Sequence, residues 1–270
     1  MKTPWIILAL VLVILLVFGI AWSFGRRDTP AEPVVSGLPQ DAAASGAPSI
    51  ASPVPSAAAV STKPVRIPPQ KKSAHFETST PAHGAVLPAP PINVVVDFNF
   101  DLAVPSAISV TKDGVEYGRG ETIIDANKLS MRRAVDQNAP DGLYTVRYTA
   151  CWPDRSCHDG NFNFVINRSS AGAAVDYRTA SSVIIRMKDI AFVPPVIRIR
   201  PGTKVTWVND DAVDHYVNTD SHPAHTYFPS QNSRALAQGA TYATTFTQPG
   251  AYPYHCSAHA ATMTGMIIVS

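Results

Sequence analysis

Hydrophobic positions are distributed along this chain in three successive patterns. The first is an apolar run from Ile6 to Ala21 that contains no charged residue. Residues 26–74 are dominated by Pro, Ala and Ser, with few large apolar side chains and no periodicity. From residue 75 onward, short apolar runs alternate with turn residues, which is typical of β-strands. The pattern predicts a membrane-length helix, a disordered linker that cannot offset its ordering entropy, and an all-β remainder.

The N-terminal run has the length of a membrane span. Trp5 and Trp22 bracket it, and a rise of about 1.5 Å per residue separates the two indoles by roughly 26 Å, close to the hydrocarbon thickness of a bilayer. A secretory signal has a shorter apolar region and a small-residue cleavage site, whereas this run is followed by "WSFGRR". We therefore expect residues 4–25 to form a transmembrane anchor that is not cleaved.

The remainder divides into two β-rich segments. Residues 75–167 contain the runs "INVVVDFNF", "AISVTKDG", "LYTVRYTA" and "NFNFVIN", separated by Asp-Gly turns. Residues 168–180 form a polar linker, and residues 181–270 contain "SVIIRMKD", "VIRIRPG", "TKVTWVND", "TYATTFT" and "TGMIIVS". Repeated short strands with such turns predict an antiparallel β-sandwich for residues 75–167, and the whole is expected to be an all-β fold of two β-sandwiches in series.

The charge and the cysteine content indicate which partners and which compartment to expect. The net charge is +2 and the basic residues are scattered, so nucleic acid is not expected as a partner. Cys151 and Cys157 lie in one local loop, and in an oxidising compartment they are expected to form a disulfide. Cys256 is then unpaired, and metal ligation explains it. These cysteines favour a location of the sandwiches outside the cytoplasm.

The residues around Cys256 suggest copper. His259 and Met263 follow it closely, and His215 lies upstream in "DHYVN". Thiolate and imidazole bind copper in both oxidation states, and a weak thioether suits an electron-transfer centre. A closed zinc site would use firmer ligands than Met. We therefore predict that His215, Cys256, His259 and Met263 bind one copper ion; strand alternation places the competing thioether, Met266, in the core.

Three further histidines lie near this set. His222 and His225 occur in "TDSHPAHTYFP", where they either bind a second, looser copper or are polar residues of a surface loop. His255 is expected to point to the opposite side of its strand from Cys256 and not to be a ligand of the first copper.

Residues 181–270 resemble the cupredoxin family, the Greek-key sandwich of plastocyanin, amicyanin and azurin. The elements that carry the resemblance are "FVPPVIRIRPGTKVTWVNDD", "DHYVN" and "PGAYPYHCSAHAATMTGMIIV". The resemblance implies a type 1 (blue) copper site in which His215, Cys256, His259 and Met263 correspond to the four ligands. The four-residue interval from His259 to Met263 is not the family's most familiar one.

Other copper chemistries and hydrolysis are not expected in this domain. Multicopper oxidases and copper nitrite reductases have a His directly after the Cys, where this chain has Ser257. A binuclear purple centre needs a second bridging thiolate, and a metal-bound Cys256 would not act as a nucleophile. The sequence therefore predicts that the protein is not an enzyme.

Residues 75–167 resemble the CopC-type copper-resistance proteins, through "HFETSTPAHGAVLPAPP" and "CHDGNFNFVI". In that family an N-terminal His binds Cu(II) through its free amine and ring, and an Asp-x-His element completes the site. Here His75 follows the linker, and Ser156 replaces the His after Asp154. We expect this sandwich to have lost that site, with His75, His83 and His158 as an alternative set.

Together these observations predict a membrane-anchored copper protein that exchanges single electrons with a redox partner protein. The expected location is the cell membrane, single-pass, with both sandwiches on the periplasmic side. Small residues around His259, such as Ala260 and Ala261, would let a partner approach its ring. Two alternatives stay open: copper trafficking or resistance involving a copper-handling protein, and an interaction module on a stalk.

Overall fold

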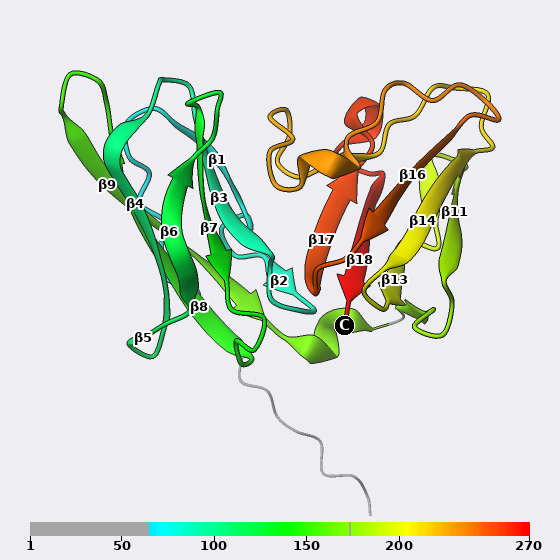
Figure 1. The fold of residues 1–270 in the computed structure, drawn as a ribbon, viewed down its shortest axis with the longest axis horizontal. Helices are drawn as coiled ribbons and strands as arrows, with labels where there is room; N and C mark the ends of the chain where they lie inside the picture. The colour runs from blue at the N-terminus through cyan, green and yellow to red at the C-terminus, as the bar shows by residue number, and fades with distance from the viewer. Residues whose placement is uncertain (1–64, 173) are drawn as a thin grey trace, which may run out of the picture. The chain divides into compact units, whose positions relative to one another are not determined.

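The computed structural model describes residues 65–172 and 174–270. The predicted anchor, residues 4–25, lies outside the described residues, as does the linker up to residue 64. No helix among the described residues combines the length and the apolar character of a membrane span. The described residues belong to one compact unit and form two β-sandwiches in chain order (Figure 1). The predicted all-β fold of two sandwiches in series is confirmed.

The first sandwich has two sheets of antiparallel strands, apart from one short parallel pair. Its four-stranded sheet has the order β1 (Phe76–Thr80), β3 (Asn93–Phe98), β7 (Ser130–Val135) and β6 (Gly118–Ile124). Its five-stranded sheet has the order β2 (Val86–Leu87), β9 (Cys157–Ile166), β8 (Gly142–Cys151), β4 (Ala103–Lys112) and β5 (Val115–Glu116), with β2 parallel to β9. Aromatic side chains such as Phe98, Tyr144 and Phe162 fill the core between the sheets.

The second sandwich also has a five-stranded and a four-stranded sheet. The first has the order β10 (Val175–Asp176), β13 (Val196–Ile199), β18 (Thr264–Val269), β17 (Gly250–His255) and β15 (Asn218–Thr219). The second has the order β12 (Ala191–Val193), β11 (Ser182–Lys188), β14 (Thr203–Asn209) and β16 (Thr241–Phe246). Alternate residues of β11 are buried, and Val183, Ile185 and Met187 belong to the same core cluster as Trp207. Within residues 65–172 and 174–270 there are also three 3₁₀ helices: η1 (Arg168–Ala171), η2 (Pro229–Gln231) and η3 (Ser257–His259).

Parts of both predicted linkers are ordered because they complete sheet edges. The backbone of Lys71, within the linker predicted at residues 26–74, exchanges hydrogen bonds of 3.1 and 2.9 Å with Asn161 of β9. Strand β10 lies within the linker predicted at residues 168–180 and pairs in parallel with β13. The predicted disulfide between Cys151 and Cys157 is present and joins the ends of β8 and β9.

Strand β3 is buried on both faces. Val94 and Val96 point into the core of the first sandwich. Val95 lies between them in sequence, and it packs with the core of the second sandwich. The next outward residue, Asp97, is 2% exposed. A strand that looks half-buried in sequence is therefore covered on its second face by the other sandwich.

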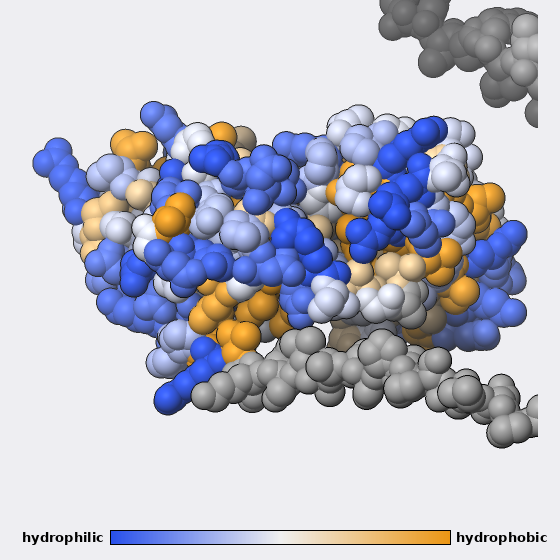
Figure 2. Space-filling view, turned by 90° about the horizontal axis from the view of Figure 1, so that it is seen from below, coloured by the Kyte–Doolittle hydropathy of each residue, from blue (hydrophilic) through white to orange (hydrophobic). Residues whose placement is uncertain are grey.

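The surface in Figure 2 mixes hydrophilic and hydrophobic residues. Large exposed apolar side chains are spread over several strands, among them Val104 of β4, Ile123 of β6 and Ile184 of β11. Exposed apolar residues that lie on separate strands in this way are ordinary for a protein surface.

Candidate metal centre

His215, Cys256 and His259 converge at one point of the second sandwich. The Sγ of Cys256 lies 3.6 Å from Nδ1 of His215 and 3.6 Å from Nδ1 of His259. Cys256 and His215 are fully buried, whereas His259 is partly exposed. Two imidazole nitrogens therefore face one thiol sulfur in a site with one partly open side.

The turn after β17 places Cys256, His259 and Met263. Helix η3 starts directly after Cys256, and the His259 amide donates a hydrogen bond of 2.9 Å to the Cys256 carbonyl. The Cys256 amide donates to the Met263 carbonyl at 3.0 Å, which closes the turn before β18. Met263 is fully buried in the same apolar cluster as Cys256. The short spacing from Cys to Met thus forms one compact turn that keeps the thiol and the thioether in the same core.

Asp211 orients His215. Its Oδ2 lies 2.8 Å from Nε2 of His215, so the Nε2 proton is donated to the carboxylate and the lone pair of Nδ1 faces Cys256. The backbone amides of Asp189 and Ile190 donate to the same carboxylate at 2.8 and 2.9 Å. The bond from Ile190 contributes most to holding the pKa of Asp211 below its usual value. The sequence did not identify Asp211 as the residue that orients His215. The available signal was the position of this acidic residue four residues before the histidine.

The residues fit a copper ion. Bond lengths known from zinc sites, about 2.0–2.1 Å to nitrogen and about 2.3 Å to sulfur, place these atoms about 3.6–3.8 Å apart for angles between tetrahedral and trigonal. The two separations of 3.6 Å at Cys256 agree with this spacing. The backbone amide of Tyr216 donates to the Cys256 sulfur at 3.3 Å, a contact of the kind that tunes a copper-bound thiolate.

A second histidine cluster consists of His222, His225 and His255. Their ring centroids are 5.2–5.5 Å apart. His255 is buried and points away from Cys256, as its strand position predicted, while His222 is exposed. Burial, helped by His255 and His222, lowers the pKa of His225 to about 4. The sequence alone groups only His222 with His225, because the contact with His255 depends on the fold of the intervening loop.

The alternative histidine set of the first sandwich is not assembled. Among the residues that the structure describes, the two clusters above are the groups of three or more metal-binding side chains, and neither contains His75, His83 or His158. His75 stacks on Phe100, and Nδ1 of His83 accepts a hydrogen bond from a backbone amide in β9.

The fold and this site define the class of protein: an all-β copper-binding domain of the cupredoxin type, preceded by a CopC domain. Residues 179–270 match the family of copper binding proteins described as plastocyanin/azurin family, and residues 76–167 match the CopC domain. The chain is 33% identical over 102 residues to Amicyanin-alpha of Methylorubrum extorquens. The match covers 37% of this chain and 83% of the relative. The chain therefore belongs to the plastocyanin/azurin family of copper-binding proteins.

The chain is also similar to a second amicyanin and to solved structures of small copper proteins. Amicyanin of Paracoccus denitrificans is 26% identical over 94 residues, covering 33% of this chain and 65% of that protein. A solved Cu(I) structure of an amicyanin variant is 23% identical, covering 33% of this chain and 83% of its own, with a TM-score of 0.30. A purple cupredoxin from Nitrosopumilus maritimus is 28% identical, with coverages of 33% and 99% and a TM-score of 0.29.

Proposed function

We propose that the second sandwich binds one copper ion in a type 1 site and transfers single electrons. His215, Cys256 and His259 are the strong ligands, and Met263 is the weak axial one. The observation that carries this proposal is the position of two imidazole Nδ1 atoms, each 3.6 Å from one buried sulfur. The similarity to two amicyanins supports it. Bound copper supplies the chemistry by alternating between Cu(I) and Cu(II).

The surrounding residues keep the ligands in place during electron transfer. Asp211 fixes the ring of His215, and the amide of Tyr216 stabilises negative charge on the Cys256 sulfur. The buried sulfur and the buried imidazole are shielded from water, so little solvent has to rearrange when the charge of the site changes. These groups position the ligands and stabilise charge, and none of them is assigned a step in which a covalent bond changes. The proposed function is therefore electron transfer without catalysis.

His259 is the proposed exit for the electron. Its side chain is partly exposed, and Ala258 and Ala261 beside it are exposed and small. A partner redox protein can therefore approach the imidazole without displacing a bulky side chain. The partner is expected to be another protein with a one-electron centre.

The proposed location is the outer side of the cell membrane. Residues 4–25 anchor the chain, residues 26–64 serve as the tether, and the two sandwiches lie in the periplasm. The disulfide between Cys151 and Cys157 supports an oxidising compartment. Protease added to spheroplasts should degrade the sandwiches; protection from protease until the cells are lysed would exclude this orientation.

The test of the copper site uses the purified full-length chain. One equivalent of Cu(II) should produce an intense visible thiolate-to-copper absorption band, and an inorganic one-electron reductant should bleach it reversibly. Cys256→Ser should abolish the band, whereas Thr262→Ser, an exposed change in the same turn, should retain it. A band in Cys256→Ser, or none in the unaltered protein, would refute a type 1 site.

Copper trafficking is a second candidate function, and the CopC domain favours it. A delivery protein has to release its copper, whereas an electron carrier has to keep it. Retention of the absorption band for hours with excess copper chelator would support electron transfer. Loss of the band within minutes, with copper sensitivity of cells that lack the protein, would support trafficking.

A further inference from the structure

The second histidine cluster lies outside the proposed type 1 site. Nε2 of His225 is 3.2 Å from Nε2 of His255. One ligand atom from each of His222, His225 and His255 lies within 4.8 Å of the other two. His222 and His225 come from the loop between β15 and η2, and His255 is the last residue of β17. Three imidazoles from two separate segments therefore meet at one point.

Hydrogen bonds direct a lone pair of His255 into this cluster. Its Nδ1 lies 3.0 Å from Oδ1 of Asp220, so Nδ1 carries the proton and donates it to the carboxylate. Nε2 of the neutral ring is then unprotonated and faces Nε2 of His225. A carboxylate behind an imidazole is the arrangement that orients histidine ligands in metal sites.

His225 holds the proton that a metal ion would replace. Because Nε2 of His255 is an acceptor, Nε2 of His225 is the donor in their 3.2 Å contact. The hydroxyl of Ser257 lies 3.0 Å from the same nitrogen. Two nitrogens of a tetrahedral site, each about 2.0–2.1 Å from the ion, are separated by about 3.3–3.4 Å. The observed separation is thus already close to that of two ligands of one ion.

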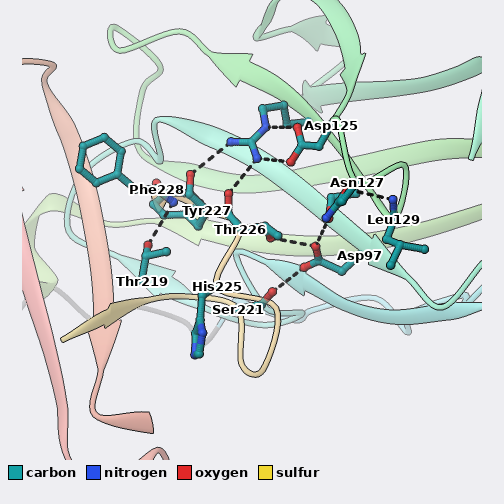
Figure 3. A network of polar contacts seen from close by, with 12 residues as sticks. Asp97, Asp125, Asn127, Leu129, Thr219, Ser221, His225, Thr226, Tyr227 and Phe228 are labelled. Carbon is teal, nitrogen blue, oxygen red and sulfur yellow. Dashed lines mark hydrogen bonds and ion pairs between the residues drawn. The ribbon is translucent and has the colours of Figure 1, made fainter. Parts of the chain in front are cut away.

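The first sandwich holds the loop that carries two of these histidines (Figure 3). The carboxylate of Asp97 accepts hydrogen bonds from the hydroxyls of Ser221 and Thr226, the latter at 2.8 Å. Arg132 donates to the carbonyl of Thr226 at 2.8 Å. His222 and His225 lie between Ser221 and Thr226, so the segment that carries them is fixed at both ends. Hydrogen bonds from the first sandwich therefore fix the backbone that carries His222 and His225.

The open side of the cluster leaves room for further ligands. A shallow cavity of about 260 Å³ borders Asp220, His222 and His255. His222 is exposed, so rotation of its side chain can bring its nitrogen toward the other two without disturbing the core. A water molecule can complete four-coordination from this side.

We propose that His222, His225 and His255 form a second metal site for a divalent ion that prefers imidazole ligands, Cu(II) or Zn(II). Imidazole suits both ions, and the absence of sulfur among these three ligands makes a Cu(I) site less favourable. The site goes beyond the proposed electron-transfer function. It does not depend on that function, because it shares no ligand with the type 1 site.

A metal titration of the purified full-length protein tests this proposal. The first equivalent of Cu(II) is reported by the thiolate band, and a second should bind without increasing that band and give an electron paramagnetic resonance spectrum with nitrogen coupling. Zn(II) added to Cys256→Ser, followed by calorimetry, shows whether zinc also binds. Binding of one ion but not the other identifies the metal.

Variants separate the histidine cluster from other surface sites. His222→Ala should weaken binding of the second ion at least tenfold, and His222→Ala with His225→Ala should abolish it, while the thiolate band is retained. His158→Ala, an exposed histidine outside the cluster, is the matched control and should bind both equivalents. Because His222 is exposed, its replacement by Ala leaves the packed core unchanged. No stoichiometric second ion, or equal binding in the double variant, would overturn the proposal even if the type 1 site is intact.

Discussion

The carboxylate of Asp97 in β3 accepts a hydrogen bond of 2.8 Å from the hydroxyl of Thr226, which is 129 residues further along the chain. Both side chains are buried, and Ser130 donates to the same carboxylate oxygen at 2.7 Å. A buried carboxylate requires such donors because its desolvation is costly. One acidic residue of the first sandwich therefore fixes the loop of the second sandwich that carries His222 and His225.

Replacing Asp97 with Ala should destabilise the protein and loosen the second metal site. Losing hydrogen bonds to a charged group costs about 1.5–3 kcal/mol of unfolding free energy. Urea denaturation measures this loss, and calorimetry should show weaker binding of the second ion. Asp101→Ala, an exposed acidic residue of the same sandwich, is the control. Equal stability of the two variants would contradict a structural role for Asp97.

The sequence was sufficient to predict the sandwiches and the close spacing of Cys256, His259 and Met263 after a strand. Alternating apolar positions identify strands such as β11, and the spacing of Cys256, His259 and Met263 fits a single turn. These features depend on contacts between residues close in the chain. His215 is predicted as a ligand from its residue type, and the resemblance to cupredoxins implies the same residue, but its 3.6 Å approach to Cys256 is a contact between distant segments.

Contacts between distant segments could not be predicted in the same way. In sequence, Val95 and Asp97 occupy the outward positions of a half-buried strand, and only the packing of the second sandwich buries them. The strand position of His255 likewise predicts that its side chain points away from the copper site, but it does not predict the contacts with His225 and Asp220. Asp211 is one acidic residue among several, and its role depends on the backbone amides of residues 189–190. Such pairings are determined by tertiary structure and not by local pattern.

Asp211→Asn should weaken copper binding at the first site by about 10-fold or more. The two carboxylate oxygens of Asp211 accept three N–H groups, including that of His215, and an amide has only one acceptor oxygen. The ring of His215 would lose its fixed orientation. Competition with a copper chelator measures the affinity. Asp210→Asn changes the neighbouring carboxylate, which pairs with Arg186 instead, and should bind copper normally.

Met263→Leu should keep the copper and raise its reduction potential. Leucine has a similar volume and no sulfur, so the core is preserved while the weak ligand is removed. Loss of that donor disfavours Cu(II) relative to Cu(I), and axial ligands tune the potential of such sites. Voltammetry of the purified protein measures the change. An unchanged potential in Met263→Leu, or an equal shift in the control Met266→Leu, would exclude Met263 as the axial ligand.

Ala261→Glu should slow electron self-exchange between Cu(I) and Cu(II) copies of the protein. Two copies that meet through His259 would bring the new carboxylates together, and like charges oppose association. Added salt should restore part of the rate by screening. Nuclear magnetic resonance line broadening in mixtures of the two oxidation states measures exchange. Val104→Glu, at an 85% exposed position of the first sandwich, should leave the rate unchanged. Equal rates in both variants would exclude His259 as the exit.

The metal-free protein should lose stability as the pH falls from about 6.5 to about 4. Burial holds the pKa of His225 at about 4 in the folded state, below the usual value of 6.5. Between these values the unfolded chain binds a proton at His225 that the folded chain does not, so the free energy of unfolding decreases as the pH is lowered. The contribution of His225 levels off below about pH 4.

Urea denaturation at a series of pH values, with chelator present, tests this origin of the pH dependence. His225→Gln removes the titrating group and should flatten the decline between pH 6.5 and 4. His158→Gln replaces an exposed histidine and should leave the decline as steep as in the unaltered protein. If the curves of the two variants are parallel, His225 is not the group responsible, and its burial in the metal-free protein is less than the structure indicates.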